Sequence, residues 1–372
     1  MDDIRKLPVA LIGAVVIVLS GAFVIACSRP APAPGGPNDT RPPTDPVAQA
    51  GTVTQLATGT KVSAPSLLVD RDGVVHATWR AGLTEDAEII YRGLAQSSDW
   101  TEPVVLSEGL TYAGRQSLRA RPDGIVCLAW WGVLGQANGL HQRCRDEGRW
   151  TGAELLEAAL TGSLSAATTA DGVVHTLRVA GTGVRVDDRE LNGQPHGGVF
   201  DGRLVAAGGV LHTLWLDDAL RFRQSADGGR TWSDATVLGK RGWTRVDAAA
   251  DATGGLHVVF DGPDGLTYRY RTPDGAWRDP ELVLRGDIAA HRAVVVGPDH
   301  QPRIFVARSN GIDRIVRRED DWVPAERVAA QGTPVAEVAA AVDPEDDVHL
   351  IWITADDSTA VWYTELTGAI RA

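Results

Sequence analysis

Residues 72–79 read Asp-Gly-Val-Val-His-Ala-Thr-Trp, and variants of this phrase return along the whole chain. A turn, often Asp-Gly, precedes an aliphatic pair, a residue that is most often histidine, and an apolar run that ends in an aromatic residue. The histidine position recurs at the following places: His76, Cys127, His175, His212, His257, Ile304 and His349. A unit that returns about every 45 residues indicates a repeat architecture.

Each unit contains four short apolar runs separated by turns, which is typical of a β-propeller blade. The sequence therefore predicts an all-β fold, a β-propeller of seven four-stranded blades. Six blades remain an alternative, because the third unit is short. The last unit lacks a final strand after Tyr363, and residues 52–57 have no partner of their own. We therefore expect the N-terminal strand to complete the last blade and close the ring.

The turn at 225–232 reads Ser-Ala-Asp-Gly-Gly-Arg-Thr-Trp and fits the Asp-box pattern Ser-x-Asp-x-Gly-x-Thr-Trp. With the repeats, it resembles the sialidase-like propellers, also called BNR-repeat proteins, over residues 52–372. In that family the motif is a structural element distant from the catalytic face. The resemblance thus gives Ser225, Asp227, Gly229 and Trp232 a role in the fold, through turn hydrogen bonds, a positive φ and packing.

Sialidases of this family carry three arginines for the substrate carboxylate, a tyrosine paired with a glutamate, and an aspartic acid. The first arginine usually stands in an Arg-Ile-Pro motif near the start of the domain, and residues 60–69 contain no arginine. Tyr112 is the one tyrosine in a connection between blades. The sequence favours a protein that is not an enzyme. The alternative is an exo-sialidase-like glycoside hydrolase, with Tyr112 and Glu337 as its catalytic candidates.

Arginines recur just before the predicted innermost strands, which begin at one mouth of the central channel. Three such arginines can hold a carboxylate or sulfate in bidentate fashion, and neighbouring aromatic rings can stack on a sugar. The alternative is a set of solvated charges at the rim. The candidate ligand-binding residues are Arg115, Arg245, Arg292, Trp243 and His291.

The repeated histidines are interpreted as packed structural groups, because they track the blade rather than a single site. We find no metal-binding or cofactor motif, so none is predicted. The net charge of −12 argues against an electrostatic footprint for nucleic acid. Cys127 and Cys144 lie in two strand-like runs joined by a turn-rich segment, which predicts a cross-strand disulfide. The alternative is two buried thiols.

Residues 1–27 have a charged head, an apolar stretch and the ending Val-Ile-Ala-Cys, as in an export signal. The ending resembles the bacterial lipobox, which implies cleavage before Cys27 and acylation of its thiol. An uncleaved membrane anchor is the alternative. Residues 28–51 contain seven prolines and read as a Pro-rich disordered linker. Both interpretations place the propeller, residues 52–372, outside the cytoplasm, tethered at the cell envelope (outer membrane or cell surface).

These observations lead to one functional hypothesis and two alternatives. We expect a surface-tethered, non-catalytic propeller that binds a glycan, a polysaccharide or an envelope protein through its channel-mouth face. The alternatives are a sialidase-like glycoside hydrolase and an envelope scaffold or assembly subunit. The hypothesis rests in part on analogy between folds, because propellers carry many functions.

Overall fold

The computed structural model divides the chain into two units, Met1–Thr44 and Asp45–Ala372. The residues that the structure describes all lie in the second unit, and the account below concerns that unit alone. They are 49–82, 87–95, 99–107, 110–134, 137–158, 163–180, 182–192, 198–199, 201–240, 245–286, 291–318, 321–356 and 358–367.

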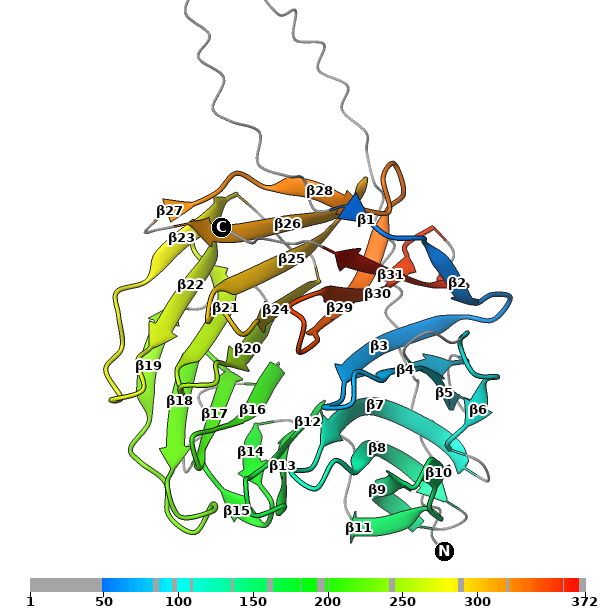
Figure 1. Cartoon of the computed structure of the whole chain (residues 1–372). Coiled ribbons are helices and arrows are strands. Elements are labelled where there is room, and N and C mark those ends of the chain that lie inside the picture. Colours follow the sequence, from blue (N-terminus) through cyan, green and yellow to red (C-terminus); the bar gives the residue numbers. More distant parts are fainter. Residues whose placement is uncertain are drawn as a thin grey trace, which may run out of the picture. The chain divides into compact units, whose positions relative to one another are not determined.

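Seven antiparallel sheets, each built around four strands, form a β-propeller, which confirms the predicted fold and blade number (Figure 1). The first three blades are consecutive meanders. Blade 1 contains β3 (Val62–Val69), β4 (Val75–Ala81), β5 (Glu88–Leu94) and β6 (Val104–Val105). Blade 2 contains β7 (Leu110–Ala120), β8 (Val126–Leu134), β9 (Ala137–Asp146), β10 (Arg149–Trp150) and β11 (Glu154–Ala158). Blade 3 contains β12 (Ser163–Thr168), β13 (Val174–Ala180), β14 (Gly183–Val186) and β15 (Arg189–Glu190).

The next three blades repeat this pattern. Blade 4 contains β16 (Asp201–Ala207), β17 (Val210–Leu216), β18 (Ala219–Ser225) and β19 (Thr236–Lys240). Blade 5 contains β20 (Val246–Ala250), β21 (Leu256–Gly262), β22 (Gly265–Arg271) and β23 (Glu281–Arg285). Blade 6 contains β24 (Arg292–Val296), β25 (Pro302–Arg308), β26 (Gly311–Arg318), β27 (Asp321–Trp322) and β28 (Glu326–Ala329).

Blade 7 is built from both ends of the described chain. It contains β29 (Val335–Val342), β30 (Val348–Thr354) and β31 (Val361–Thr367), and β31 pairs with β2 (Thr54–Ala57) and β1 (Gln49–Ala50). The predicted closure by the N-terminal strand is therefore present. The innermost strand of each blade contacts that of the next, and β29 contacts β3, so the ring is complete.

The hydrophobic core lies between neighbouring blades rather than in one central mass. Three positions after the repeated histidine, the second strand carries an aromatic residue in most blades, and these side chains are fully or almost fully buried: Trp79, Trp130, Trp215, Phe260 and Trp352. In blade 3 this position holds Arg178, whose Nη1 lies 2.7 Å from Oε1 of Glu157 in blade 2. The interface between blades 2 and 3 is thus partly polar, and a cavity of about 360 Å³ opens beside it.

Candidate functional site

A polar cavity of about 580 Å³ occupies the channel at the end where the innermost strands begin, which we call the channel mouth. Each of the seven innermost strands places a polar or charged side chain in its wall: Ser66, Gln116, Ser165, Arg203, Asp247, Arg292 and Glu337. Five of these side chains share one position of the repeat, because each lies opposite the residue two after the histidine position in the second strand. Gln116 and Glu337 lie at shifted registers beside irregularities of their strands.

A chain of three polar side chains, two of them charged, crosses the wall of this cavity. Arg245, just before β20, donates from Nη1 to Nε2 of His291, just before β24, over 2.8 Å. The same Nε2 lies 3.4 Å from Oε2 of Glu337 in β29. Glu337 Oε2 also accepts a hydrogen bond of 3.1 Å from the backbone N–H of Ala64, which has a φ of 52° in an irregular part of β3. The three side chains therefore link blades 5, 6, 7 and 1 at one place.

Two other arginines of the wall are held by carboxylates. Arg203 contacts Asp201 and Asp247, at 3.1 and 3.0 Å. Burial disfavours its charge, yet these two carboxylates raise the pKa of the guanidinium above its usual value. Arg292 is almost fully buried and donates to Oδ2 of Asp261 over 2.7 Å. Both arginines therefore hold blades together, and Arg292, which we predicted to bind ligand, has a structural contact of its own.

The structure brings together four of the candidates from sequence, since Arg245, His291, Arg292 and Glu337 all line one cavity. The backbones of Tyr112 and Arg115 lie in β7, but their side chains fall outside the described part of the structure. Trp243 and Cys27 also lie outside the described residues.

Gln116 and Asp247 were not among the sequence candidates. Gln116 donates from Nε2 to the carbonyl of Ala64 and to Oγ1 of Thr78, at 3.1 and 2.9 Å. Asp247 accepts from the backbone N–H of Val294 over 2.9 Å. The signal that would have found both is the alternation of strand residues, which sends every second side chain of an innermost strand into the channel.

The repeated histidines form a buried structural triad in three blades. In each, Nε2 contacts an aspartate six residues earlier and Nδ1 contacts a tyrosine hydroxyl on the third strand. In blade 5 these distances are 3.2 Å from His257 to Asp251 and 2.8 Å to Tyr268. The three triads are Asp70–His76–Tyr91, Asp251–His257–Tyr268 and Asp343–His349–Tyr363. These histidines are part of the fold.

The tryptophan of the turn between third and fourth strands packs on the preceding blade. Trp150 meets Tyr91 edge-on, with ring centroids 5.0 Å apart, and Trp322 meets Tyr268 in the same way. Blade 2 holds a disulfide at the histidine position, because Cys127 faces Cys144 across β8 and β9 and the two are bonded. The tyrosines and histidines of the three triads thus serve packing.

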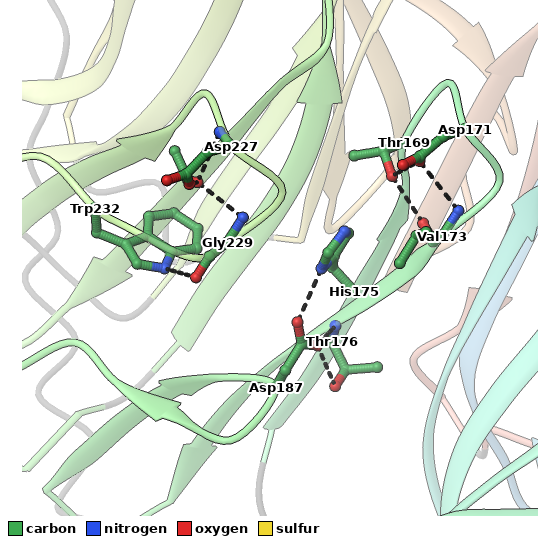
Figure 2. A network of polar contacts seen from close by, with 10 residues as sticks. Thr169, Asp171, Val173, His175, Thr176, Asp187, Asp227, Gly229 and Trp232 are labelled. Carbon is green, nitrogen blue, oxygen red and sulfur yellow. Dashed lines mark hydrogen bonds and ion pairs between the residues drawn. The ribbon is translucent and has the colours of Figure 1, made fainter.

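The turn at Ser225–Trp232 is held by side chains of its own sequence, as Figure 2 shows in part. Ser225 Oγ accepts from the N–H of Gly229 over 2.8 Å, and Asp227 accepts from the N–H and hydroxyl of Thr231 over 2.8 and 2.6 Å. These hydrogen bonds lower the pKa of Asp227 to about 2. Trp232 donates from Nε1 to the carbonyl of Gly229 over 3.1 Å.

Within the described ranges, no three His, Cys, Asp or Glu side chains form a group able to hold a metal ion. The part of the chain that the structure describes also contains no helix long and apolar enough to span a bilayer.

No protein-family model and no curated protein matches the chain. Solved structures do resemble it. A protein of unknown function from Dyadobacter fermentans has a TM-score of 0.52 at 11% identity, over 84% of this chain and 98% of that one. The NanB sialidase from Streptococcus pneumoniae has a TM-score of 0.51 at 10% identity, over 86% and 70%. The α-L-arabinofuranosidase Arb93A from Fusarium graminearum has a TM-score of 0.50 at 13% identity, over 83% and 97%. At such identities the likeness shows the fold alone, a sialidase-like β-propeller.

Proposed function

We propose that this propeller binds a glycan at the channel mouth without hydrolysing it. The observation that carries the proposal is the chain of Arg245, His291 and Glu337 in the wall of a polar cavity of about 580 Å³. A guanidinium, an imidazole and a carboxylate together offer donors and acceptors to the hydroxyl and acidic groups of a sugar. The volume lies in the range of ordinary ligand sites.

We propose that hydrolysis is absent because the carboxylates in the wall are already held by other groups of the protein. A glycoside hydrolase of the common type needs a pair of carboxyl groups that flank the bond to be cleaved. Of the two described carboxylates that line the cavity, Asp247 is bound by Arg203 and by the N–H of Val294. Glu337 is bound by the N–H of Ala64. The four described tyrosines are in the blades, in contact with the repeated histidines or, for Tyr270, also with Asp251.

The fold likeness to a sialidase and an arabinofuranosidase supports carbohydrate as the ligand class, and it keeps a sialidase-like hydrolase as the second candidate. We further propose that the protein acts at the cell envelope, tethered through Cys27. This part of the proposal rests on the sequence of residues 1–27.

A glycan and polysaccharide binding screen on the compact unit from Asp45 onward tests the proposal, with turnover of a fluorogenic sialoside measured in the same wells. We expect binding without turnover, and Arg245→Ala should weaken binding by about 10- to 100-fold, the range for one charge-assisted contact. Arg189→Ala removes an exposed arginine of β15 and serves as the matched control. Turnover that Glu337→Gln abolishes would favour the hydrolase, and no binding would overturn the proposal.

A further inference from the structure

Blade 3 has a histidine at the repeat position but departs from the buried triad of blades 1, 5 and 7. The position six residues before its histidine holds Thr169 in place of aspartate, and Oγ1 of Thr169 bonds Asp171 over 2.6 Å and the carbonyl of Val173 over 3.0 Å. The third strand provides no tyrosine. Instead, Oδ2 of Asp187 lies 2.8 Å from Nδ1 of His175. His175 therefore lacks both the aspartate on Nε2 and the tyrosine hydroxyl on Nδ1 that the triads have. Its one partner in the described blades is the carboxylate of Asp187 on Nδ1.

This exchange leaves one nitrogen of His175 without a hydrogen bond. Since a carboxylate only accepts, Nδ1 carries the proton that goes to Asp187, and a ring with this one proton presents Nε2 as an acceptor. His175 is 4% exposed, and its buried Nε2 has no hydrogen-bond partner among the described residues. A buried polar atom without a partner costs free energy, so a ligand that supplies a donor would recover that cost.

His175 lines a cavity of about 460 Å³ between blades 3 and 4. Figure 2 shows the ring between two turns, one with Thr169 and Asp171 and the other with Asp227 and Gly229. Both turns join strands at the end where innermost strands finish. The cavity therefore opens on the face opposite the channel mouth, and it is separate from the site proposed above.

The charges in this wall select the ligand. Asp171 and Asp227 both line the cavity, and hydrogen bonds from Thr169 and Thr231 lower the pKa values of their carboxyls, so both stay ionised. Arg230 is the basic residue of the lining. Two carboxylates and an imidazole acceptor against one guanidinium favour a positively charged hydrogen-bond donor.

We propose that this cavity is a binding site for a small organic amine, whose protonated primary amino group donates to Nε2 of His175 beside Asp171 and Asp227. An amino sugar and a short aliphatic diamine are two sources of this chemistry. Either fits a cavity of about 460 Å³. The site is independent of glycan binding at the channel mouth and would exist if that proposal failed.

The test is a titration of the full chain, followed by long-range ¹H–¹⁵N NMR of the histidine rings. The His175 signals are assigned by their loss in His175→Gln. Glucosamine is compared with glucose, and 1,4-diaminobutane with 1,4-butanediol. We expect one amine or both to shift the His175 signals in a saturable way, while neither neutral counterpart does. The amine whose titration saturates shows whether the site takes an amino sugar or a diamine.

Two variants sharpen the result. Thr169→Asn places an uncharged amide beside Nε2, which can donate an N–H to it and compete with the amine, and should weaken amine binding at least tenfold, whereas Thr169→Ser keeps the hydroxyl and should bind as the native chain does. Arg230→Ala removes the one repulsive charge and should tighten amine binding severalfold.

Weaker amine binding in Arg230→Ala would overturn the charge argument, since Arg230 would then contribute to binding instead of opposing it. Native shifts that persist unchanged in Thr169→Asn would show that Nε2 is not the acceptor, and absence of any saturable shift in the native chain would refute the site. Thermal unfolding of each variant, compared with Thr169→Ser, shows whether a loss reflects unfolding.

Discussion

Arg245 donates a hydrogen bond from Nη1 to Nε2 of His291 over 2.8 Å, which joins the start of β20 to the start of β24 across the channel mouth. An imidazole nitrogen that accepts from a guanidinium carries no proton, so the ring of His291 is neutral in this arrangement. Both side chains can carry a positive charge, but in this contact only Arg245 carries one.

A double-mutant cycle of Arg245→Ala and His291→Ala should reveal this contact as a coupling of about 1 kcal/mol in the free energy of unfolding, the usual value of one hydrogen bond. The measurement is urea unfolding of the four proteins at pH 7. The cycle of His291→Ala with Arg189→Ala, on the outer strand of blade 3, is the control and should be additive. Additive effects in both cycles would show that the contact contributes nothing.

The free energy of unfolding should decrease as the pH decreases, because of the buried imidazole of His212. This residue is 1% exposed and stacks on Phe222, and burial lowers its pKa from 6.5 to about 4. The unfolded chain therefore binds a proton near pH 6.5 and the folded chain only near pH 4. The contribution is complete above pH 6.5 and is lost as pH falls toward 4, by about 3 kcal/mol.

His212→Leu should remove this part of the pH dependence. The pKa values of His76 and His257 are also lowered by burial, and they keep their contributions in both proteins. The difference between the two unfolding curves, measured in urea from pH 7 to pH 4, therefore isolates His212. Parallel curves would refute this assignment.

The disulfide of Cys127 and Cys144 should stabilise the propeller through the unfolded state. The two cysteines are 17 residues apart, and closing a loop of that size contributes about 3 kcal/mol. We expect the double variant Cys127→Ala with Cys144→Ala to unfold at correspondingly lower urea concentration. The native protein after reduction should match the variant, and equal stability of oxidised and reduced protein would contradict the prediction.

Removal of the N-terminal strand should open the ring. A chain that begins after Ala57 loses β1, β2 and the side chain of Leu56, which is buried between blades 7 and 1. The third strand β31 then becomes an exposed edge, which favours pairing between molecules. Calorimetry should show a lower melting temperature and gel filtration a concentration-dependent oligomer. A chain that begins at Gln49 keeps both strands, is the matched control and should be monomeric under the same conditions.

The proposed tether can be tested through Cys27. Expression of the full chain in a bacterium supplied with an alkyne-labelled fatty acid should label the native protein, while Cys27→Ser should stay unlabelled and keep its leader. Cys144→Ser controls for loss of a cysteine as such. Labelling of Cys27→Ser would contradict the lipobox interpretation, and an unlabelled native protein in the membrane fraction would favour the uncleaved anchor.

The blades could be predicted from the sequence because the residues that form each blade are close together in the chain and recur in the same order. An Asp-Gly turn, a buried aromatic residue three positions after the histidine, and a turn tryptophan all act within one blade or its neighbour. The same reasoning interpreted His257 and its equivalents as structural, and their contacts with Asp251 and Tyr268 show why they repeat.

The contacts of the site were less accessible, because they join residues far apart in sequence. Position relative to the strand starts placed Arg245, His291 and Glu337 at one mouth, yet nothing in the sequence indicated that Asp261 would hold Arg292. An arginine that binds a ligand and an arginine that binds a carboxylate of a neighbouring blade have the same local pattern. Only the three-dimensional packing separates them.

The seventh blade combines the first and last strands of the described chain, and this has a mechanical consequence. A pull on the segment before Gln49 acts on the hydrogen bonds between β1, β2 and β31 before it reaches any other blade. These hydrogen bonds hold the two ends of the described chain together and so keep the ring closed. In a chain held by its N-terminal end, blade 7 would therefore take up the applied force, and disruption of blade 7 would open the ring.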